Sequence, residues 1–182
     1  MHATTCITLP ALLCVCLLAG CTGLPDGVQP VSGFELDRYL GTWYEVARLD
    51  HRFERGLSNV TATYSLRDDG GVRVANRGYD VEAQSWEEAI GKAYFIGASD
   101  IGRLKVSFFG PFYGGYNILE LDQNNYRYAL VAGPNRSFLW ILARTPTLDD
   151  KTLGMLVARA QELEFPTAEL IYVEHDDDAA AP

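Results

Sequence analysis

GTWYEVAR, residues 41–48, is a strand-like run in which tryptophan, the largest of the standard amino acids, stands at position 43, two residues after Gly41. A glycine suits a position where the chain turns sharply and a side chain would collide with its surroundings. An indole needs extensive burial, and its partners must come from elsewhere in the chain. Further strand-like runs follow at regular intervals, which favours an all-β domain.

Eight runs carry this pattern, and turn signals separate them. Asp68-Asp69-Gly70-Gly71 predicts a hairpin turn, because glycine tolerates a positive φ, and residues 122–125 predict another. No helical pattern interrupts the series, which favours an antiparallel meander over parallel βαβ units. The eight predicted strands are 42–48, 59–66, 72–79, 88–96, 103–109, 116–121, 126–132 and 138–144.

One helix follows the strands. Thr147 begins a variant of the capping box, and Phe165-Pro166 ends the helix. Residues 169–174 predict a short ninth strand. An amphipathic helix after an even number of antiparallel strands indicates packing against the outside of a closed sheet. The predicted fold is therefore an all-β, eight-stranded antiparallel up-and-down β-barrel with one C-terminal flanking α-helix, a size that can hold one small ligand. The apolar face of the helix consists of Leu153, Leu156, Val157, Ala160 and Leu163.

Composition and net charge limit the classes of partner that the protein can bind. The chain has 182 residues, 48% hydrophobic and 21% charged, which predicts one packed domain. Its net charge of −9 argues against a nucleic-acid partner and against electrostatic adhesion to anionic lipid headgroups.

The N-terminus predicts a lipoprotein leader. Residues 1–20 contain no Asp, Glu, Lys or Arg and hold a short apolar run, as in a signal peptide. Leu18-Ala19-Gly20-Cys21 resembles the bacterial lipobox, which makes Cys21 the lipid anchor; an ordinary secretory leader cut nearby is the alternative. The expected organisation is a signal peptide (1–20), a lipidated N-terminus and Gly/Pro-rich tether (21–33), one folded domain (34–175) and a disordered acidic tail (176–182).

Cysteine positions exclude several chemistries. Cys6, Cys14 and Cys16 lie in the leader, so the mature domain beyond Cys21 has no thiol. Disulfides, thiolate metal ligands and a cysteine nucleophile are therefore not expected.

Several motifs together resemble one family. YLGTWYEVARLDHRFERGL (39–57) is similar to the first lipocalin motif, G-x-W, in its bacterial form. The likeness continues through TATYSLRDDGG (61–71), GKAYF (91–95), LKVSFFGPFYGGYN (104–117) and LWILARTPT (139–147). The chain is identified as a member of the bacterial lipocalins, outer-membrane lipoproteins of the apolipoprotein D-like branch. The resemblance implies an eight-stranded barrel, a flanking helix and a cavity for fatty acids or lysophospholipids.

The resemblance also implies how the barrel closes. The third family motif places an arginine at the end of the last strand, and Arg144 matches it. The resemblance implies that this guanidinium would stack on the Trp43 indole. Gly41, Trp43 and Arg144 are then barrel-closing structural residues. The second family motif is only partly kept in residues 121–126, which leaves open any partner surface built on that turn.

Ligand contacts are expected from inward-facing residues. We expect ligand binding by Phe95, Phe108, Tyr116 and Trp140; filling of the core is the alternative for each of them. The loop 110–115 exposes aromatic residues between glycines, and this indicates that Tyr113 covers a pocket mouth, a partner or a membrane. Arg52 or Arg55 could hold a carboxylate or phosphate, or be a solvated loop charge. The wider inward set is Ala62, Tyr64, Val74, Val106, Ile118, Leu130, Phe138 and Leu142.

Catalysis is not expected. His51 and His175 are the histidines beyond the leader, and no metalloprotease, phosphate-binding or nucleophile-elbow motif is present. We expect neither a metal nor a cofactor, and no enzyme activity.

The sequence therefore predicts a lipid-anchored protein on the periplasmic face of the outer membrane. It would bind and store or transport lysophospholipids or fatty acids for envelope maintenance. The alternatives are a homodimeric interaction module built on Phe112 and Tyr113, and a lipid-modifying enzyme on the same barrel.

Overall fold

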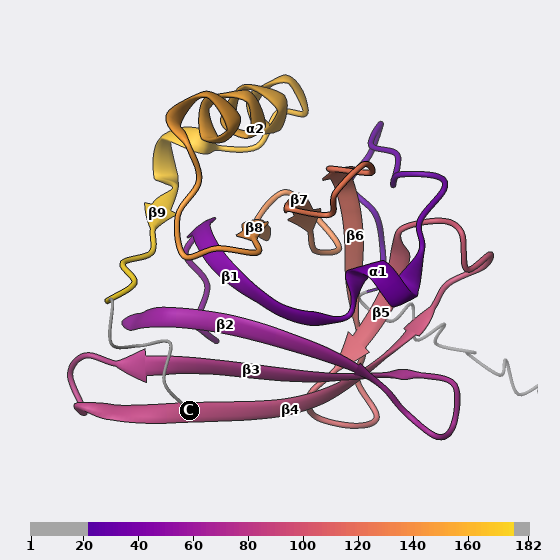
Figure 1. Ribbon diagram of the computed structural model, residues 1–182, viewed down its shortest axis with the longest axis horizontal. Helices are drawn as coiled ribbons and strands as arrows, with labels where there is room; N and C mark the ends of the chain where they lie inside the picture. The colour runs from indigo at the N-terminus through magenta and orange to yellow at the C-terminus, as the bar shows by residue number, and fades with distance from the viewer. Residues whose placement is uncertain (1–21, 177–182) are drawn as a thin grey trace, which may run out of the picture.

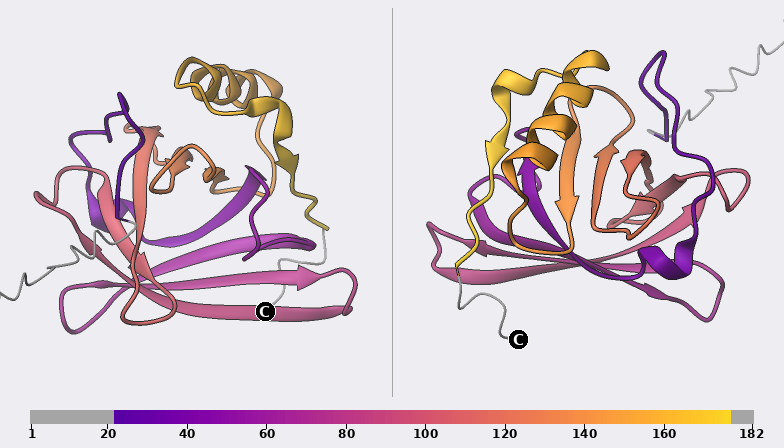
Figure 2. Two further views of the ribbon diagram at one scale, coloured as in Figure 1. Left: turned by 180° about the vertical axis from the view of Figure 1, so that it is seen from behind. Right: turned by 45° about the horizontal axis from the view of Figure 1, so that its top comes forward.

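The structure, a computed structural model, describes residues 22–176 (Figures 1 and 2). The predicted leader and Cys21 lie outside the described residues, as do residues 177–182. The elements in chain order are α1 (Leu36–Tyr39), β1 (Gly41–Arg48), β2 (Leu57–Leu66), β3 (Val72–Asp80), β4 (Ser85–Phe95), β5 (Arg103–Ser107), β6 (Gly114–Leu121), β7 (Tyr128–Ala132), β8 (Leu139–Ala143), α2 (Asp150–Glu162), the 3-10 helix η1 (Thr167–Glu169) and β9 (Ile171–Tyr172).

The sheet closes on itself. Each strand from β1 to β8 pairs antiparallel with its sequence neighbour, and β8 pairs with β1 to complete the ring. The pairing of β1 with β2 runs from Gly41 opposite Tyr64 to Tyr44 opposite Thr61. The predicted eight-stranded antiparallel barrel is confirmed. The short strand β9 is additional and pairs with the last two residues of β1.

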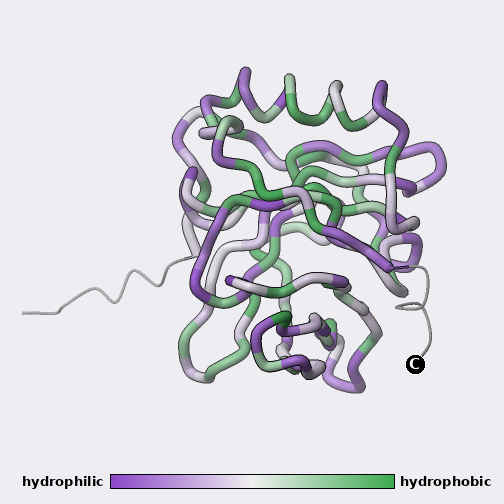
Figure 3. The backbone as a smooth tube through the Cα atoms, turned by 90° about the vertical axis from the view of Figure 1, so that its left-hand side faces the viewer, coloured by the Kyte–Doolittle hydropathy of each residue, from purple (hydrophilic) through white to green (hydrophobic). Residues whose placement is uncertain are grey.

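Two apolar clusters stabilise the fold. One lies inside the barrel, at its closed end and along the cavity wall, and includes Trp43 and Tyr39. The other lies between α2 and the outer face of β1, β6, β7 and β8, and it includes Leu156. Figure 1 shows α2 on one side of the barrel and the long β3–β4 hairpin on the other. Hydrophobic and hydrophilic residues alternate along α2, as expected of a helix with one buried face (Figure 3).

The helix α2 was predicted correctly, but its cap was not. Asp149 caps the helix, because its carboxylate accepts hydrogen bonds from the Thr152 backbone N–H at 2.9 Å and from the Thr152 hydroxyl at 2.8 Å. Thr147, the expected first residue, lies before the cap and accepts a hydrogen bond at its carbonyl oxygen from the Thr145 hydroxyl at 2.7 Å.

The segment before α1 differs from the loose tether that its composition predicted. Val28 is buried in the outer cluster, and the Val31 backbone N–H donates to the Ile118 carbonyl at 2.9 Å. Ser32 forms a bridge with Ile101, and the Phe34 backbone N–H donates to the Asp100 carbonyl at 2.9 Å. These contacts hold the described part of the segment against the barrel wall.

The C-terminal strap, which we define as residues 171–176, also packs against the barrel. Its β9 strand pairs with Ala47 and Arg48, beyond the point where β1 leaves β2. The ninth strand was therefore predicted correctly but is shorter than expected. Asp176 was placed in the disordered tail, but its backbone N–H donates to the Asn59 side chain at 2.8 Å.

Candidate functional site

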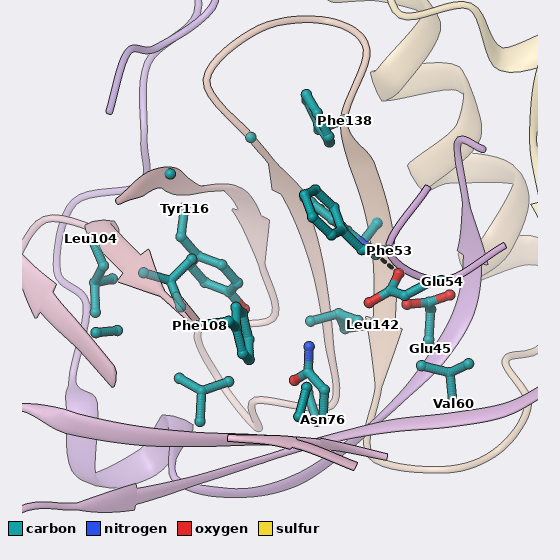
Figure 4. A pocket seen from close by; sticks show the side chains of 18 of the residues that line it. Glu45, Phe53, Glu54, Val60, Asn76, Leu104, Phe108, Tyr116, Phe138 and Leu142 are labelled. Atoms are coloured by element: carbon teal, nitrogen blue, oxygen red, sulfur yellow. Dashed lines mark hydrogen bonds between the residues drawn. The ribbon is translucent and has the colours of Figure 1, made fainter. Parts of the chain in front are cut away.

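The barrel encloses a cavity of about 890 Å³, a volume typical of small-molecule sites. We call its open end the mouth, where residues 49–56, 108–113 and 133–138 connect the strands. Figure 4 shows side chains from opposite walls converging on this space. The middle of the wall is apolar, and its residues include Val72, Val74, Ala93, Leu104, Val106 and Leu142.

Trp43 and Arg144 close the opposite end. Trp43 is fully buried, and the Arg144 Cζ atom lies 4.0 Å from the centroid of its ring. Gly41 has a φ of +93°, a conformation that L side chains rarely adopt, and it lies next to the guanidinium. The structure thus brings together all three residues expected to close the barrel. Arg144 also donates four hydrogen bonds, at 2.8–3.3 Å, to the backbone carbonyls of Arg38, Leu40, Thr42 and Tyr126.

Three tyrosines form the cavity floor above this plug. The Tyr116 hydroxyl lies 2.7 Å from the Tyr39 hydroxyl and 2.8 Å from the Tyr64 hydroxyl. The Tyr39 ring packs on Trp43 with their centroids 4.6 Å apart. Burial is the main cause that raises the pKa of each phenol above its ordinary value of 10.0. All three therefore stay neutral at physiological pH.

A buried polar cluster interrupts the apolar wall near the mouth. Arg48 donates to the Glu45 carboxylate at 2.7 Å and to the Glu54 backbone carbonyl at 2.7 Å. The Glu54 carboxylate in turn accepts a hydrogen bond from the Trp140 indole at 3.0 Å and lies 3.0 Å from His51 Nε2. Both carboxylates line the cavity, and Figure 4 shows them side by side.

The two carboxyl groups of this cluster differ in acidity. Burial, together with the nearby Glu54 charge, raises the pKa of Glu45 well above its ordinary value. Burial acts on Glu54 in the same direction, but the adjacent His51 ring and the hydrogen bond from Trp140 outweigh it and lower the pKa of Glu54. The cluster therefore holds one readily ionised carboxylate in an apolar wall.

Aromatic and cationic groups surround the mouth. Phe109 and Phe112 are 72% and 76% exposed, far more than expected for such large apolar side chains. The Arg52 guanidinium lies 4.9 Å from the centroid of the Phe53 ring. Tyr113 lies beside Lys105, whose Nζ is 4.9 Å from its ring centroid.

Most of the predicted ligand contacts lie at the cavity. Phe108, Tyr116, Trp140, Tyr113 and Arg52 line it, whereas Arg55 forms an exposed ion pair with Asp50 at 2.7 Å. The wider inward set is also mostly correct, and Ala62, Tyr64, Val74, Val106, Phe138 and Leu142 line the cavity.

Three residues of the predicted inward set lie outside the cavity lining. Phe95 packs edge-on against Phe34 at the closed end, with their centroids 6.0 Å apart, so it is outside the cavity lining. Leu130 points outward into the cluster beneath α2. Ile118 is fully buried in the closed-end cluster, next to Gly102.

Sequence reasoning missed several residues that line the cavity, polar ones among them. Glu45 and Tyr39 were not proposed, although alternation from Trp43 places Glu45 on the inner face of β1. Asn76 was missed too. It lies among apolar residues, and its buried Oδ1 atom has no hydrogen-bond partner in the described part of the chain. Figure 4 shows Asn76 pointing into the cavity, where a ligand could satisfy it.

A sequence profile of the lipocalin-like domain matches residues 34–175 of this chain. The chain is a lipocalin. Lipocalins are generally binding and transport proteins, and a closed barrel with a cavity open at one end is the architecture that such binding requires. Along residues 22–176, no helix is both long and apolar enough to cross a membrane.

The lipocalin has close relatives among bacterial lipoproteins. It is 58% identical over 163 residues to the outer membrane lipoprotein Blc of Vibrio cholerae serotype O1, covering 90% of this chain and 95% of the relative. It is 57% identical over 150 residues to Blc of Escherichia coli K12, covering 82% and 84%. These identities show that it belongs with the bacterial lipocalin lipoproteins.

Solved structures agree on the fold. Insecticyanin from the tobacco hornworm Manduca sexta superposes with a TM-score of 0.69 over 86% of this chain and 89% of that chain, at 20% sequence identity.

Among the residues that the structure describes, no three His, Cys, Asp or Glu side chains are grouped so that they could hold a metal ion.

Proposed function

We propose that this lipocalin binds one single-chain lipid, a lysophospholipid or a fatty acid, and stores or carries it for maintenance of the cell envelope. The observation that carries the proposal is the cavity of about 890 Å³, apolar along its wall, closed by Trp43 and Arg144 and open at the other end. An acyl tail would enter through the mouth and extend toward the tyrosine floor.

The energetics suit a tail of about sixteen carbons. Burial contributes about 0.8 kcal/mol per CH₂, so such a tail supplies roughly 12 kcal/mol before losses. Lost freedom of the ligand and ordering of side chains at the site offset much of that gain. What remains is consistent with micromolar or tighter affinity, which corresponds to about −8 kcal/mol.

The mouth supplies a partner for an anionic headgroup. Arg52 lines it, and within the described part of the chain Arg52 forms no ion pair. Its guanidinium lies on the Phe53 ring, which holds it near the mouth. A phosphate or carboxylate at this position would gain charge-assisted hydrogen bonds, while the tail remains in the apolar space.

We further propose that Cys21 is acylated and anchors the protein at the periplasmic face of the outer membrane. The leucine and small residues before Cys21 support this, as do the names of the Blc relatives. The described chain begins beside the mouth, because the Gly23 carbonyl accepts a hydrogen bond from Asn117 at 3.2 Å and Gly23 packs against Pro134. An anchor at Cys21 would therefore hold the mouth close to the membrane that supplies the lipid.

The cavity is tested by filling it. Val106→Trp adds a large side chain to the wall, and Val81→Trp, at a 59% exposed position, is the matched control. Calorimetric titration with lysophosphatidylethanolamine and with hexadecanoic acid should show at least tenfold weaker binding for Val106→Trp and unchanged binding for the control. Equal affinity in both variants, with circular dichroism showing both folded, would place the lipid outside the barrel.

The anchor needs a separate test. Cys21→Ser should leave a protein that is no longer labelled by radioactive palmitate and that leaves the membrane fraction. Unchanged membrane fractionation and labelling would reject acylation at this residue.

Homodimerisation is a second candidate function, favoured by the exposed rings of Phe109 and Phe112. A second copy could bury both rings and extend the apolar wall. Sedimentation of the soluble domain and of Phe112→Ser tests this: a dimer that disappears with the substitution supports it, and a monomer in both argues against it.

Catalysis is not part of the proposal. The cluster of Glu45, Glu54 and His51 is the arrangement closest to acid–base machinery. Bound lysophospholipid should nevertheless be recovered intact after hours of incubation, and its hydrolysis would reassign the cavity as an active site.

A further inference from the structure

The tyrosine floor contains more hydrogen-bond donors than the protein can use. Each phenol carries one O–H donor, so Tyr39, Tyr64 and Tyr116 together have three. Two hydrogen bonds connect them, through Tyr116, at 2.7 and 2.8 Å. Whichever way the three hydroxyls rotate, two protons are used and one remains.

The remaining proton has no acceptor in the described protein. Within residues 22–176, the three hydroxyls make no hydrogen bond other than the two between them. All three residues line the cavity, and Figure 4 shows Tyr116 reaching into it beside Phe108. A ligand that presented only hydrocarbon here would bury an unused donor, which is unfavourable.

We propose that the floor is a subsite for a neutral oxygen at the far end of the ligand tail, so that the protein accepts single-chain lipids whose acyl chain carries a hydroxyl, keto or epoxide group near the methyl end. The subsite deepens the proposed lipid-binding function and rests on it. The oxygen would accept the spare phenolic proton, and the apolar wall would contact the rest of the chain.

A carboxylate fits this floor less well than a neutral oxygen. A buried anion requires a counter-ion or several donors, and the floor offers one neutral O–H. The nearest guanidinium, that of Arg144, lies beneath the Trp43 ring and directs its nitrogens to backbone carbonyls. The fatty-acid carboxylate therefore stays at the mouth.

The test compares ligands and variants together. Calorimetry measures the affinity of hexadecanoic acid and of 16-hydroxyhexadecanoic acid for the wild type, for Tyr64→Phe and for the triple variant Tyr39→Phe/Tyr64→Phe/Tyr116→Phe. Tyr64→Phe is the matched control, because the remaining pair still has one bond and one spare proton. The triple variant keeps the rings but has no donor.

The expected result is a change in ligand preference. The affinity of the hydroxylated acid relative to the plain acid should fall at least tenfold in the triple variant and stay within about threefold of wild type in Tyr64→Phe. A ratio that is the same in all three proteins would overturn the subsite. Failure of both hexadecanoic acid and lysophosphatidylethanolamine to bind the wild type would instead refute the lipid-binding function on which the subsite rests.

A second measurement needs no variant. For the wild type, a hydroxyl at carbon 12 should weaken binding more than one at carbon 16, because a mid-chain hydroxyl meets the apolar wall. Equal losses for the two acids would also overturn the subsite. A further measurement uses the triple variant: if it lost binding of 2-hydroxyhexadecanoic acid but kept binding of hexadecanoic acid, the carboxylate end would lie at the floor and the subsite would be overturned.

Discussion

Arg144 is the residue on which closure of the barrel depends. Its guanidinium stacks on Trp43 and donates hydrogen bonds to backbone carbonyls on both sides of Gly41, so both the face and the edge of the planar group make contacts. We expect Arg144→Ala to lower the free energy of unfolding by about 2–3 kcal/mol and Arg144→Lys to recover less than half of that loss. Urea denaturation of the soluble domain measures both. A lysine variant as stable as wild type would show that charge alone is sufficient.

The buried pair of Glu45 and Arg48 makes a second prediction at this scale. Both side chains are almost fully buried, and Arg48 also bonds the Leu57 carbonyl at 3.2 Å. Arg48→Met should destabilise the protein by about 3–5 kcal/mol, because it leaves the buried Glu45 carboxyl group and the Glu54 and Leu57 backbone carbonyls without their donor. Adding Glu45→Gln to Arg48→Met should restore part of the loss. A double variant less stable than the single one would contradict the pairing.

The tyrosine floor predicts sensitivity to alkali. The pKa values of Tyr39, Tyr64 and Tyr116 are raised in the folded state, so their contribution to stability is fully present below about pH 10. As the pH rises further, the unfolded chain ionises first and stability falls by about 1–4 kcal/mol. Urea unfolding at about pH 8 and about pH 11 measures this fall. The triple phenylalanine variant should show a shallower decline, and an equal decline would assign the sensitivity to other groups.

At the scale of elements, the C-terminal strap covers the place where β1 and β2 separate. The Val173 backbone N–H donates to the Val46 carbonyl at 3.0 Å, and the Asn59 N–H donates to the Glu174 carbonyl at 2.9 Å. Truncation after Leu170 should cost about 2–3 kcal/mol and speed lipid release, because it exposes the edge of β1. Denaturation and dissociation kinetics test this.

The control for the strap keeps its backbone. Tyr172→Ser changes a side chain that is 56% exposed, so it should be neutral within about 0.5 kcal/mol. Truncation with no effect on stability or on lipid release would show that the strap is passive.

The elements themselves could be predicted because their patterns are local. All eight barrel strands and α2 lie where alternation, turn residues and the helical repeat indicated. The ends of the strands were predicted less accurately. Tyr126 was placed in a strand, but it lies in the preceding turn with a φ of +54°. The packing of residues 22–34 depends on distant partners in β6 and the β4–β5 turn, which no local pattern contains.

At the scale of the molecule, the candidate site could be predicted only where the sequence indicates which face of each strand points into the barrel. Strand β7 is buried on both faces, so its residues are apolar on both sides. The sequence therefore does not indicate that Leu130 faces α2 rather than the cavity. Phe95 shares the inner face with Ala93, but Phe34 from the N-terminal segment fills the closed end, so Phe95 lies below the floor. The polar cluster depends on a β-bulge between Glu45 and Ala47, which changes the register with β8.

The most direct test of lipid uptake is photo-cross-linking with a lysophospholipid that carries a diazirine at the methyl end of its acyl chain. If the tail enters the cavity through the mouth and reaches the floor, peptide mass spectrometry should find the label on Tyr39, Tyr64 or Tyr116, and Val106→Trp should reduce it. Labelling confined to Phe109 and Phe112, and unchanged in Val106→Trp, would mean that lipid binds on the outer surface and that the cavity is not the site.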